Sequence, residues 1–256
     1  LLAQKVEPTY TYFDNGKVKD EGTLLNGKNH GFFNEYDSLG NRIKSTDYRN
    51  GVLIAAGGII SEKGLKNGAW KYFYKTGELM SEGNYKDGYK IGKWKWYFKS
   101  KKIQQQGKYK GNEKATGNWV WYYESGEIKR TEDFINGLED GYLIEYNEDG
   151  TVITKGEYIE GLKEGFWFYN VGDYREEGNY SSGEKTGEWK EFYIPNDTTL
   201  VFIGSFVDGM PIEKHIYYDA IDGKKRLDGK YVSGLREGRW FRYNKFGEKT
   251  LEIEYK

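Results

Sequence analysis

Residues 83–98 read GNYKDGYKIGKWKWYF, and this stretch decides the fold. It runs from a short segment ending at Tyr85, through the turn signal KDG at residues 86–88, to the aromatic segment Trp94–Phe98. Alternating, aromatic-rich segments fit the pleated surface of a β-sheet and lack helical period. Glycine supplies the positive φ that a tight turn requires. The stretch therefore predicts two β-strands joined by a turn, and so short a connection permits only antiparallel neighbours.

The same pattern recurs along the chain. The stretches GEYIEGLKEGFW from residue 156, GNYSSGEKTGEW from residue 178 and GKYVSGLREGRW from residue 229 share the unit G-x-Y-x-x-G-x-[KR]-x-G-x-W. The glycine two residues before the Trp position recurs at a period of about 24 residues, with Glu213 in its place once: Gly68, Gly92, Gly117, Gly141, Gly165, Gly187 and Gly238. Such a period indicates a repeat architecture.

We therefore predict an all-β fold, an elongated and coiled single antiparallel sheet of tandem β-hairpin repeats. Residues 5–256 are predicted to form one hairpin-repeat domain, because the repeat leaves no stretch for a linker or a second domain. The coiling is expected from the normal right-handed twist of strands.

Composition excludes several classes of protein. The 256 residues carry 39 Lys and Arg against 40 Asp and Glu, a net charge of −1, so the chain lacks the electrostatic footprint of a nucleic-acid binder. A mean hydropathy of −0.88 without a long apolar run predicts no transmembrane segment. Since there is no cysteine, disulfides, thiol nucleophiles and thiolate metal sites are excluded.

Catalytic chemistry finds little support in the sequence. The two histidines, His30 in a turn and His215 in a Trp position, lack the spacing of a metal site. The many carboxylates fall in turns or at alternating strand positions, as on a solvated face, and none forms a distinct catalytic pair. We predict a protein without enzymatic activity, metal or cofactor.

The aromatic side chains are the candidate binding residues. Six of the eight tryptophans occupy the recurring position, where a structural role is expected: Trp70, Trp94, Trp119, Trp167, Trp189 and Trp240. Trp96 and Trp121 are additional, and alternation places them on the same face as Trp94 and Trp119. The predicted binding cluster is Trp96, Trp121, Tyr72, Tyr74, Phe98 and Tyr123. This face is either the core of a rolled sheet or an exposed binding strip, and both interpretations stay open.

The repeat resembles MORN (membrane occupation and recognition nexus) repeats. It is most similar to the bacterial MORN variant found in proteins labelled as antitoxins of toxin–antitoxin systems, and the resemblance covers most of residues 20–256. The resemblance implies a hairpin-repeat sheet that binds protein or lipid without catalysis. No basic stripe that would hold anionic lipid is present. Residues 70–80 are also similar to the choline- and glucan-binding repeats of bacterial surface proteins.

The chain opens Leu1-Leu2-Ala3-Gln4, which looks like the remnant of a secretory signal peptide. On that interpretation the protein is exported to the periplasm, cell envelope or extracellular space; otherwise it is cytoplasmic. The function we predict is a repeat scaffold that binds a protein partner. The alternatives are a carbohydrate- or choline-type ligand binder of the cell surface, for which a glycan is the partner, and an antitoxin-like inhibitor of a toxin protein.

Overall fold

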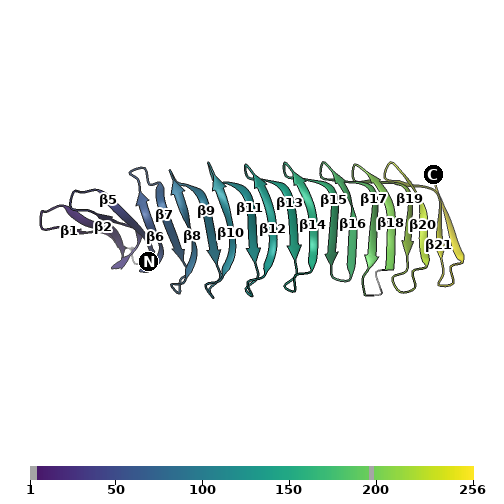
Figure 1. Ribbon diagram of the computed structural model, residues 1–256, viewed down its shortest axis with the longest axis horizontal. Helices are drawn as coiled ribbons and strands as arrows, with labels where there is room; N and C mark the ends of the chain where they lie inside the picture. The colour runs from purple at the N-terminus through teal and green to yellow at the C-terminus, as the bar shows by residue number, and fades with distance from the viewer. Residues whose placement is uncertain (1–4, 196–198) are drawn as a thin grey trace. The chain divides into compact units, whose positions relative to one another are not determined.

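The computed structural model describes residues 5–195 and 199–256, and this part of the chain contains strands and no helix. Its strands form a single open antiparallel sheet of 22 consecutive strands (Figure 1). The prediction of an all-β sheet of tandem hairpins is thus confirmed. The suggested signal remnant at residues 1–4 lies outside the described residues.

The sheet divides into two compact units, residues 1–128 with 134–137 and residues 129–133 with 138–256. The strands of the first unit are β1 (Val6–Tyr12), β2 (Val18–Leu25), β3 (Lys28–Asn29), β4 (Gly31–Tyr36), β5 (Arg42–Arg49), β6 (Val52–Ile60), β7 (Lys66–Phe73), β8 (Leu79–Lys86), β9 (Tyr89–Tyr97), β10 (Ile103–Lys110) and β11 (Lys114–Tyr122). Strand β12 (Ile128–Ile135) carries residues of both units.

The second unit continues the alternation of strand and turn. Its remaining strands are β13 (Leu138–Tyr146), β14 (Val152–Ile159), β15 (Leu162–Val171), β16 (Tyr174–Ser181), β17 (Glu184–Tyr193), β18 (Thr199–Val207), β19 (Met210–Tyr218), β20 (Lys225–Val232), β21 (Leu235–Tyr243) and β22 (Lys249–Tyr255).

Two kinds of turn join the strands. One kind is a two-residue turn such as Asp87-Gly88, in which both residues have positive φ, 50° and 85°. This is the turn geometry whose twist matches that of the flanking strands. Between β10 and β11 three residues, 111–113, take its place. The other kind is a longer turn such as residues 74–78, where the backbone N–H of Tyr74 donates to the carbonyl of Glu78 at 2.9 Å. The glycine punctuation of the sequence thus corresponds to the observed turns.

A recurring bulge explains why each repeat carries two further glycines. Between β8 and β9, Glu82 pairs with Lys95 and Asn84 pairs with Ile91, so Gly83 alone lies opposite residues 92–94. The bulged strand turns through Gly92, whose φ is +63°, a value that favours glycine. The same register shift stands at Gly107, Gly156, Gly178, Gly204 and Gly229.

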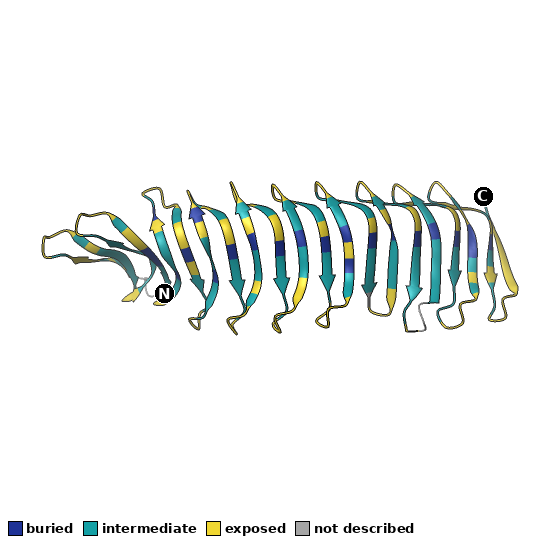
Figure 2. Cartoon of the chain, viewed as in Figure 1, coloured by how far each residue is buried: buried dark blue, intermediate teal, exposed yellow. Residues whose placement is uncertain are grey.

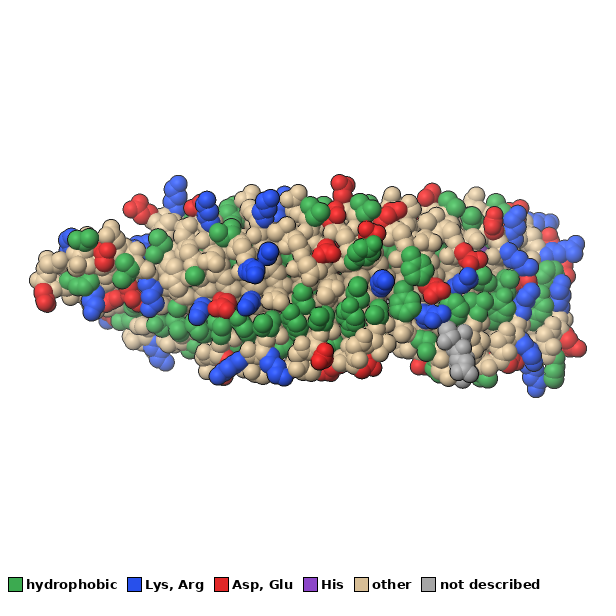
Figure 3. All heavy atoms as spheres, in the orientation of Figure 1, with side chains coloured by type: hydrophobic (Ala, Val, Ile, Leu, Met, Phe, Trp, Pro, Cys, Tyr) green, Lys and Arg blue, Asp and Glu red, His purple; other side chains and the backbone are tan. Residues whose placement is uncertain are grey.

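Burial is confined to narrow bands. Figure 2 shows the buried residues as short bands near the middle of successive strands, while the turns are exposed. In Figure 3, hydrophobic side chains gather in a band across the strands, with many of the charged side chains toward the strand ends. The core of this single-layer sheet is thus a row of side chains lying on the sheet itself. Among the described residues no helix is long and apolar enough to cross a bilayer.

Candidate functional site

The ring face of the sheet is defined as the face that carries Trp94. On this face the indole of Trp94 packs directly on the backbone of a glycine in the neighbouring strand, and we call this glycine its seat. A Cβ added to Gly83 would lie 2.2 Å from the Cδ2 and Cε2 atoms of Trp94, so the indole occupies the space where a side chain would stand. The Nε1–H of Trp94 donates to the carbonyl oxygen of Asn84 at 3.2 Å. Trp94 is consequently 1% exposed although the sheet has no second layer. A glycine inside a strand thus admits an aromatic ring over bare backbone.

The same seat recurs eleven or twelve residues before each ring. It is found for Trp119 on Gly107, Trp167 on Gly156, Trp189 on Gly178 and Trp240 on Gly229. In all but Trp119 the indole N–H donates to the carbonyl of the residue after the glycine, at 2.9–3.2 Å. The six recurring tryptophans are each at most 4% exposed, which fits a structural role.

His215 performs the role of a tryptophan in one repeat. Its imidazole lies over Gly204, and its Nε2 is 3.0 Å from the carbonyl oxygen of Ser205, to which it donates. The side chain is 2% exposed, and burial lowers the pKa of His215 below its ordinary value. The neutral imidazole is therefore the form that fits this position.

A cation lies over the recurring rings, from the [KR] position of the repeat. The Nζ atoms of Lys66, Lys90, Lys163 and Lys185 lie 4.9, 5.2, 4.6 and 3.9 Å from the ring centroids of the tryptophans four residues later. Arg236 does the same over Trp240 at 4.3 Å. Cation–π contacts of this kind contribute about 0.5–2 kcal/mol each. They cover the outer faces of the buried rings.

The predicted binding residues Tyr72, Trp96 and Trp121 join this row in the first unit. The ring centroids of Trp94 and Trp96 are 5.8 Å apart, those of Trp96 and Trp119 are 5.8 Å apart, and those of Trp119 and Trp121 are 6.0 Å apart. The ring centroid of Tyr72 lies 6.2 Å from that of Trp94. All three are half-buried, so this part of the row keeps ring surface in contact with solvent.

Tyr74, Phe98 and Tyr123 lie at a different place from those three rings. Each begins one of the longer turns, with its backbone N–H donating to the carbonyl four residues later at 2.9 Å. The hydroxyl of Tyr74 donates to the carbonyl of Tyr97 at 2.8 Å. The three side chains are half-buried at the strand ends. The predicted cluster therefore consists of a mid-sheet row and a separate set at the turns.

Hydrogen bonds fix the orientation of Tyr72. Lys66 Nζ donates to its hydroxyl at 2.7 Å, and the hydroxyls of Tyr72 and Tyr85 are 2.8 Å apart. Burial, reinforced by the hydrogen bond to Tyr85, raises the pKa of Tyr72, and burial lowers the pKa of Lys66. A similar arrangement joins Lys163 to Tyr169 at 2.7 Å in the second unit. These hydrogen bonds fix the positions of both tyrosine hydroxyls on the ring face.

One repeat lacks both the seat and the ring. Glu132 stands where the strand glycine is expected and Leu143 stands where the tryptophan is expected. Glu132 is 2% exposed and pairs with Arg130, which also lies 3.5 Å from Glu145. Burial raises the pKa of Glu132, while Arg130 opposes that shift. The [KR] position of this repeat holds Glu139, so the cation is absent where there is no ring for it to cover.

The fixed spacing of these cations, four residues before the Trp, is visible in the sequence as the [KR] position of the repeat, but it does not reveal that the cation lies over the ring. The repeat of Trp119 has Ala115 at this position. Among the described residues no group of three or more His, Cys, Asp or Glu side chains could hold a metal ion. What the arrangement offers chemically is a binding surface of rings and ammonium groups.

Comparison with known proteins agrees with the repeat pattern. The family model of the MORN repeat variant matches residues 66–87, 90–110 and 115–136, three consecutive repeats within about a quarter of the chain. No curated protein matches the chain. The crystal structure of TcdB2-TccC3 is similar over 97% of this chain at 12% sequence identity and a TM-score of 0.20, and the match spans 18% of that chain.

Proposed function

We propose that this protein is a non-enzymatic repeat scaffold that binds a protein partner through the half-buried rings of Tyr72, Trp96 and Trp121. The observation that carries the proposal is the contrast within one row of rings. The six recurring tryptophans are at most 4% exposed, whereas Trp96 and Trp121 are only half-buried. Tryptophan and tyrosine are among the side chains on which protein interfaces most often concentrate their binding energy.

The cations favour a protein partner over a choline-type ligand. An aromatic cage binds a quaternary ammonium group through the π faces of its rings. Lys66 and Lys90 already lie over the rings of Trp70 and Trp94, at 4.9 and 5.2 Å. A ligand cation would have to compete with these tethered ammonium groups, whereas a peptide can pack on the ring edges and accept hydrogen bonds at the margin of the row.

Site-specific cross-linking tests the proposal. A photoreactive benzoylphenylalanine replaces Trp96 or Trp121 in the full chain, and in a control it replaces Phe246, which is 70% exposed in a turn. We expect one adduct of defined mass from both ring positions in cell extract and none of that mass from position 246. The same adducts at all three positions, or none at the two ring positions, would refute the proposal.

A titration distinguishes the carbohydrate alternative. Choline and soluble glycans are added to the wild type while tryptophan fluorescence is followed, and the titration is repeated with Trp96→Ala and Trp121→Ala. A saturable change in fluorescence that both substitutions abolish would favour a small ligand over a protein as the partner of these rings. Export and antitoxin-like inhibition remain predictions from the sequence, and fractionation of cells producing the protein from its native gene tests the first of them.

A further inference from the structure

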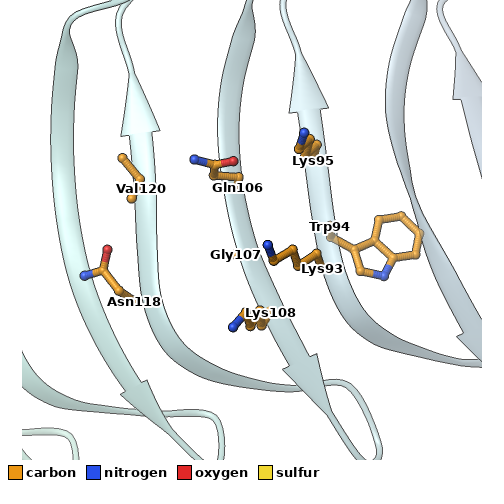
Figure 4. Close-up of a pocket in the computed structure, with 8 residues that line it drawn as sticks. All are labelled: Lys93, Trp94, Lys95, Gln106, Gly107, Lys108, Asn118 and Val120. Atoms are coloured by element: carbon orange, nitrogen blue, oxygen red, sulfur yellow. The ribbon is translucent and has the colours of Figure 1, made fainter.

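The face opposite the ring face carries a shallow trough in the first unit. Because Trp94 and Gly107 both direct their side-chain positions to the ring face, bare backbone forms the floor of the trough. A hollow of about 370 Å³ lies there between β9, β10 and β11, and Figure 4 shows its lining residues. A second hollow of about 220 Å³ adjoins it across β7 and β8 and shares Lys93 and Lys95 as walls.

The walls of this trough are cationic. Lys71, Lys93, Lys95 and Lys108 line the two hollows, against one carboxylate, that of Glu82. That carboxylate already accepts a hydrogen bond from the Tyr97 hydroxyl at 2.6 Å and lies 3.9 Å from Lys71. Among residues 5–195 and 199–256, no carboxylate oxygen lies within 4.0 Å of the ammonium groups of Lys93, Lys95 or Lys108.

Two of these lysines oppose each other directly. Lys93 pairs in register with Lys108 across β9 and β10, and like charges at directly opposite positions destabilise a sheet. The Lys93 side chain extends toward β10 while Trp94 extends the other way (Figure 4). An anion in the hollow would relieve this repulsion.

The second unit shows how the same arrangement is neutralised within the chain. There Lys214 pairs in register with Lys230, and Asp228 lies 3.4 Å from the ammonium group of Lys214. Asp228 is the residue immediately before the strand glycine, and the corresponding residue before Gly107 is Gln106. The repeat of β10 therefore has an uncharged amide at the position of the internal counterion, whereas the preceding repeat has Glu82 there.

We propose that this trough binds an acidic, extended polypeptide segment, whose carboxylates supply the missing counterions of Lys93 and Lys108. The cations are lysines on flexible stems, which suit singly spaced carboxylates, whereas phosphate groups are more often clamped by the rigid fork of arginine. The two aromatic residues that line the hollows, Trp70 and Trp94, belong to the ring row and direct their rings to the opposite face. The floor of the trough therefore offers no platform for a sugar ring or a nucleotide base. These features favour a peptide over a glycan or a nucleic acid.

A fluorescent octaglutamate peptide tests the proposal by anisotropy with the full chain at about 50 mM salt. Gln106→Glu introduces the internal carboxylate that the second unit has, and it should weaken binding about tenfold or more. Lys93→Gln combined with Lys108→Gln should do the same. Gln104→Glu changes the net charge equally at an exposed position of the same strand and should change the affinity by less than about twofold. Binding should fall with added salt, as for any exposed ion pairing.

The outcomes separate the possibilities. No binding of octaglutamate by the wild type, or equal losses for Gln106→Glu and Gln104→Glu, would overturn the proposal. So would tighter binding of a uronate oligosaccharide or a single-stranded oligonucleotide with the same dependence on residue 106. Trp96→Ala should leave octaglutamate binding intact, so the trough and the ring row can fail independently.

Discussion

Replacing Gly83 by alanine tests how the rings are buried. The new Cβ would stand 2.2 Å from the indole of Trp94, about 1.5 Å closer than ordinary van der Waals contact permits. The Trp94 ring cannot shift easily, because other rings pack against it. Its centroid lies 5.1 Å from the ring centroid of Tyr85 and 5.8 Å from that of Trp96. Burying an indole removes on the order of 200 Å² from water, worth about 5 kcal/mol at ~25 cal/mol per Å².

Since the displaced ring would keep part of its contacts, we expect Gly83→Ala to destabilise the first unit by about 2–4 kcal/mol. Gly92→Ala is the matched control. Its φ of +63° makes alanine strained there, but no atom lies within 4 Å of the new Cβ, so we expect about 1 kcal/mol. In a Trp94→Ala background the cost of Gly83→Ala should vanish, because no ring remains to be displaced.

Hydrogen exchange of the peptides from β8 to β10 measures these effects locally, which suits a repeat protein whose units open separately. Thermal unfolding followed by tryptophan fluorescence provides the global value. The reasoning fails if Gly83→Ala costs no more than Gly92→Ala, or if its cost persists unchanged when Trp94 is absent.

Three further predictions concern repeats that depart from the pattern. Glu213 occupies the bulge position at a φ of +56°, so Glu213→Gly should stabilise the protein by about 0.5–1 kcal/mol. Glu237 has an ordinary backbone conformation, so Glu237→Gly should destabilise the protein by a similar amount. The melting temperatures of the two variants and the wild type measure both effects. His215→Trp should remove a loss of stability that the wild type shows as the pH falls below about 6.5, measured by urea denaturation between pH 5 and 8. Glu132→Gly and Leu143→Trp should each destabilise the protein alone, and the double variant should recover most of that loss in thermal unfolding.

The sign of the pH effect follows from the lowered pKa of His215. The unfolded chain binds a proton at this residue more readily than the folded chain does. Stability is therefore complete above the unfolded pKa, about 6.5, and decreases as the pH falls toward the folded pKa. A wild type and a His215→Trp variant with identical pH profiles would contradict the assignment. For the paired substitutions, strictly additive losses at 132 and 143 would show that the two positions do not form one seat.

The sequence was sufficient for the strands, the turns and the order of pairing. The period of the glycines and aromatics predicted the hairpins. The reason is that each of these features depends on residues close in the sequence and repeats many times, so that its signal accumulates.

Other features could not be obtained from the pattern. The half-buried state of Trp96 depends on how its ring packs between Trp94 and Trp119, which alternation does not determine. The separation of Tyr74 from the mid-sheet row arises because the strand ends before it and a turn begins. The role of Asp228 as the internal counterion of Lys214, and the contrast with Gln106, could be recognised only after the strand register of both units was known.

The packing of each recurring indole on a glycine of the preceding strand gives the sheet a direction. Trp94 takes its seat and its hydrogen-bond acceptor from β8, the strand synthesised before it. A nascent chain can thus complete each hairpin on a support that has already emerged from the ribosome. Shortening the protein from its carboxyl end should leave every remaining indole supported, whereas a truncation from the amino end that removes β8 and keeps β9 leaves Trp94 without its glycine and its hydrogen-bond acceptor.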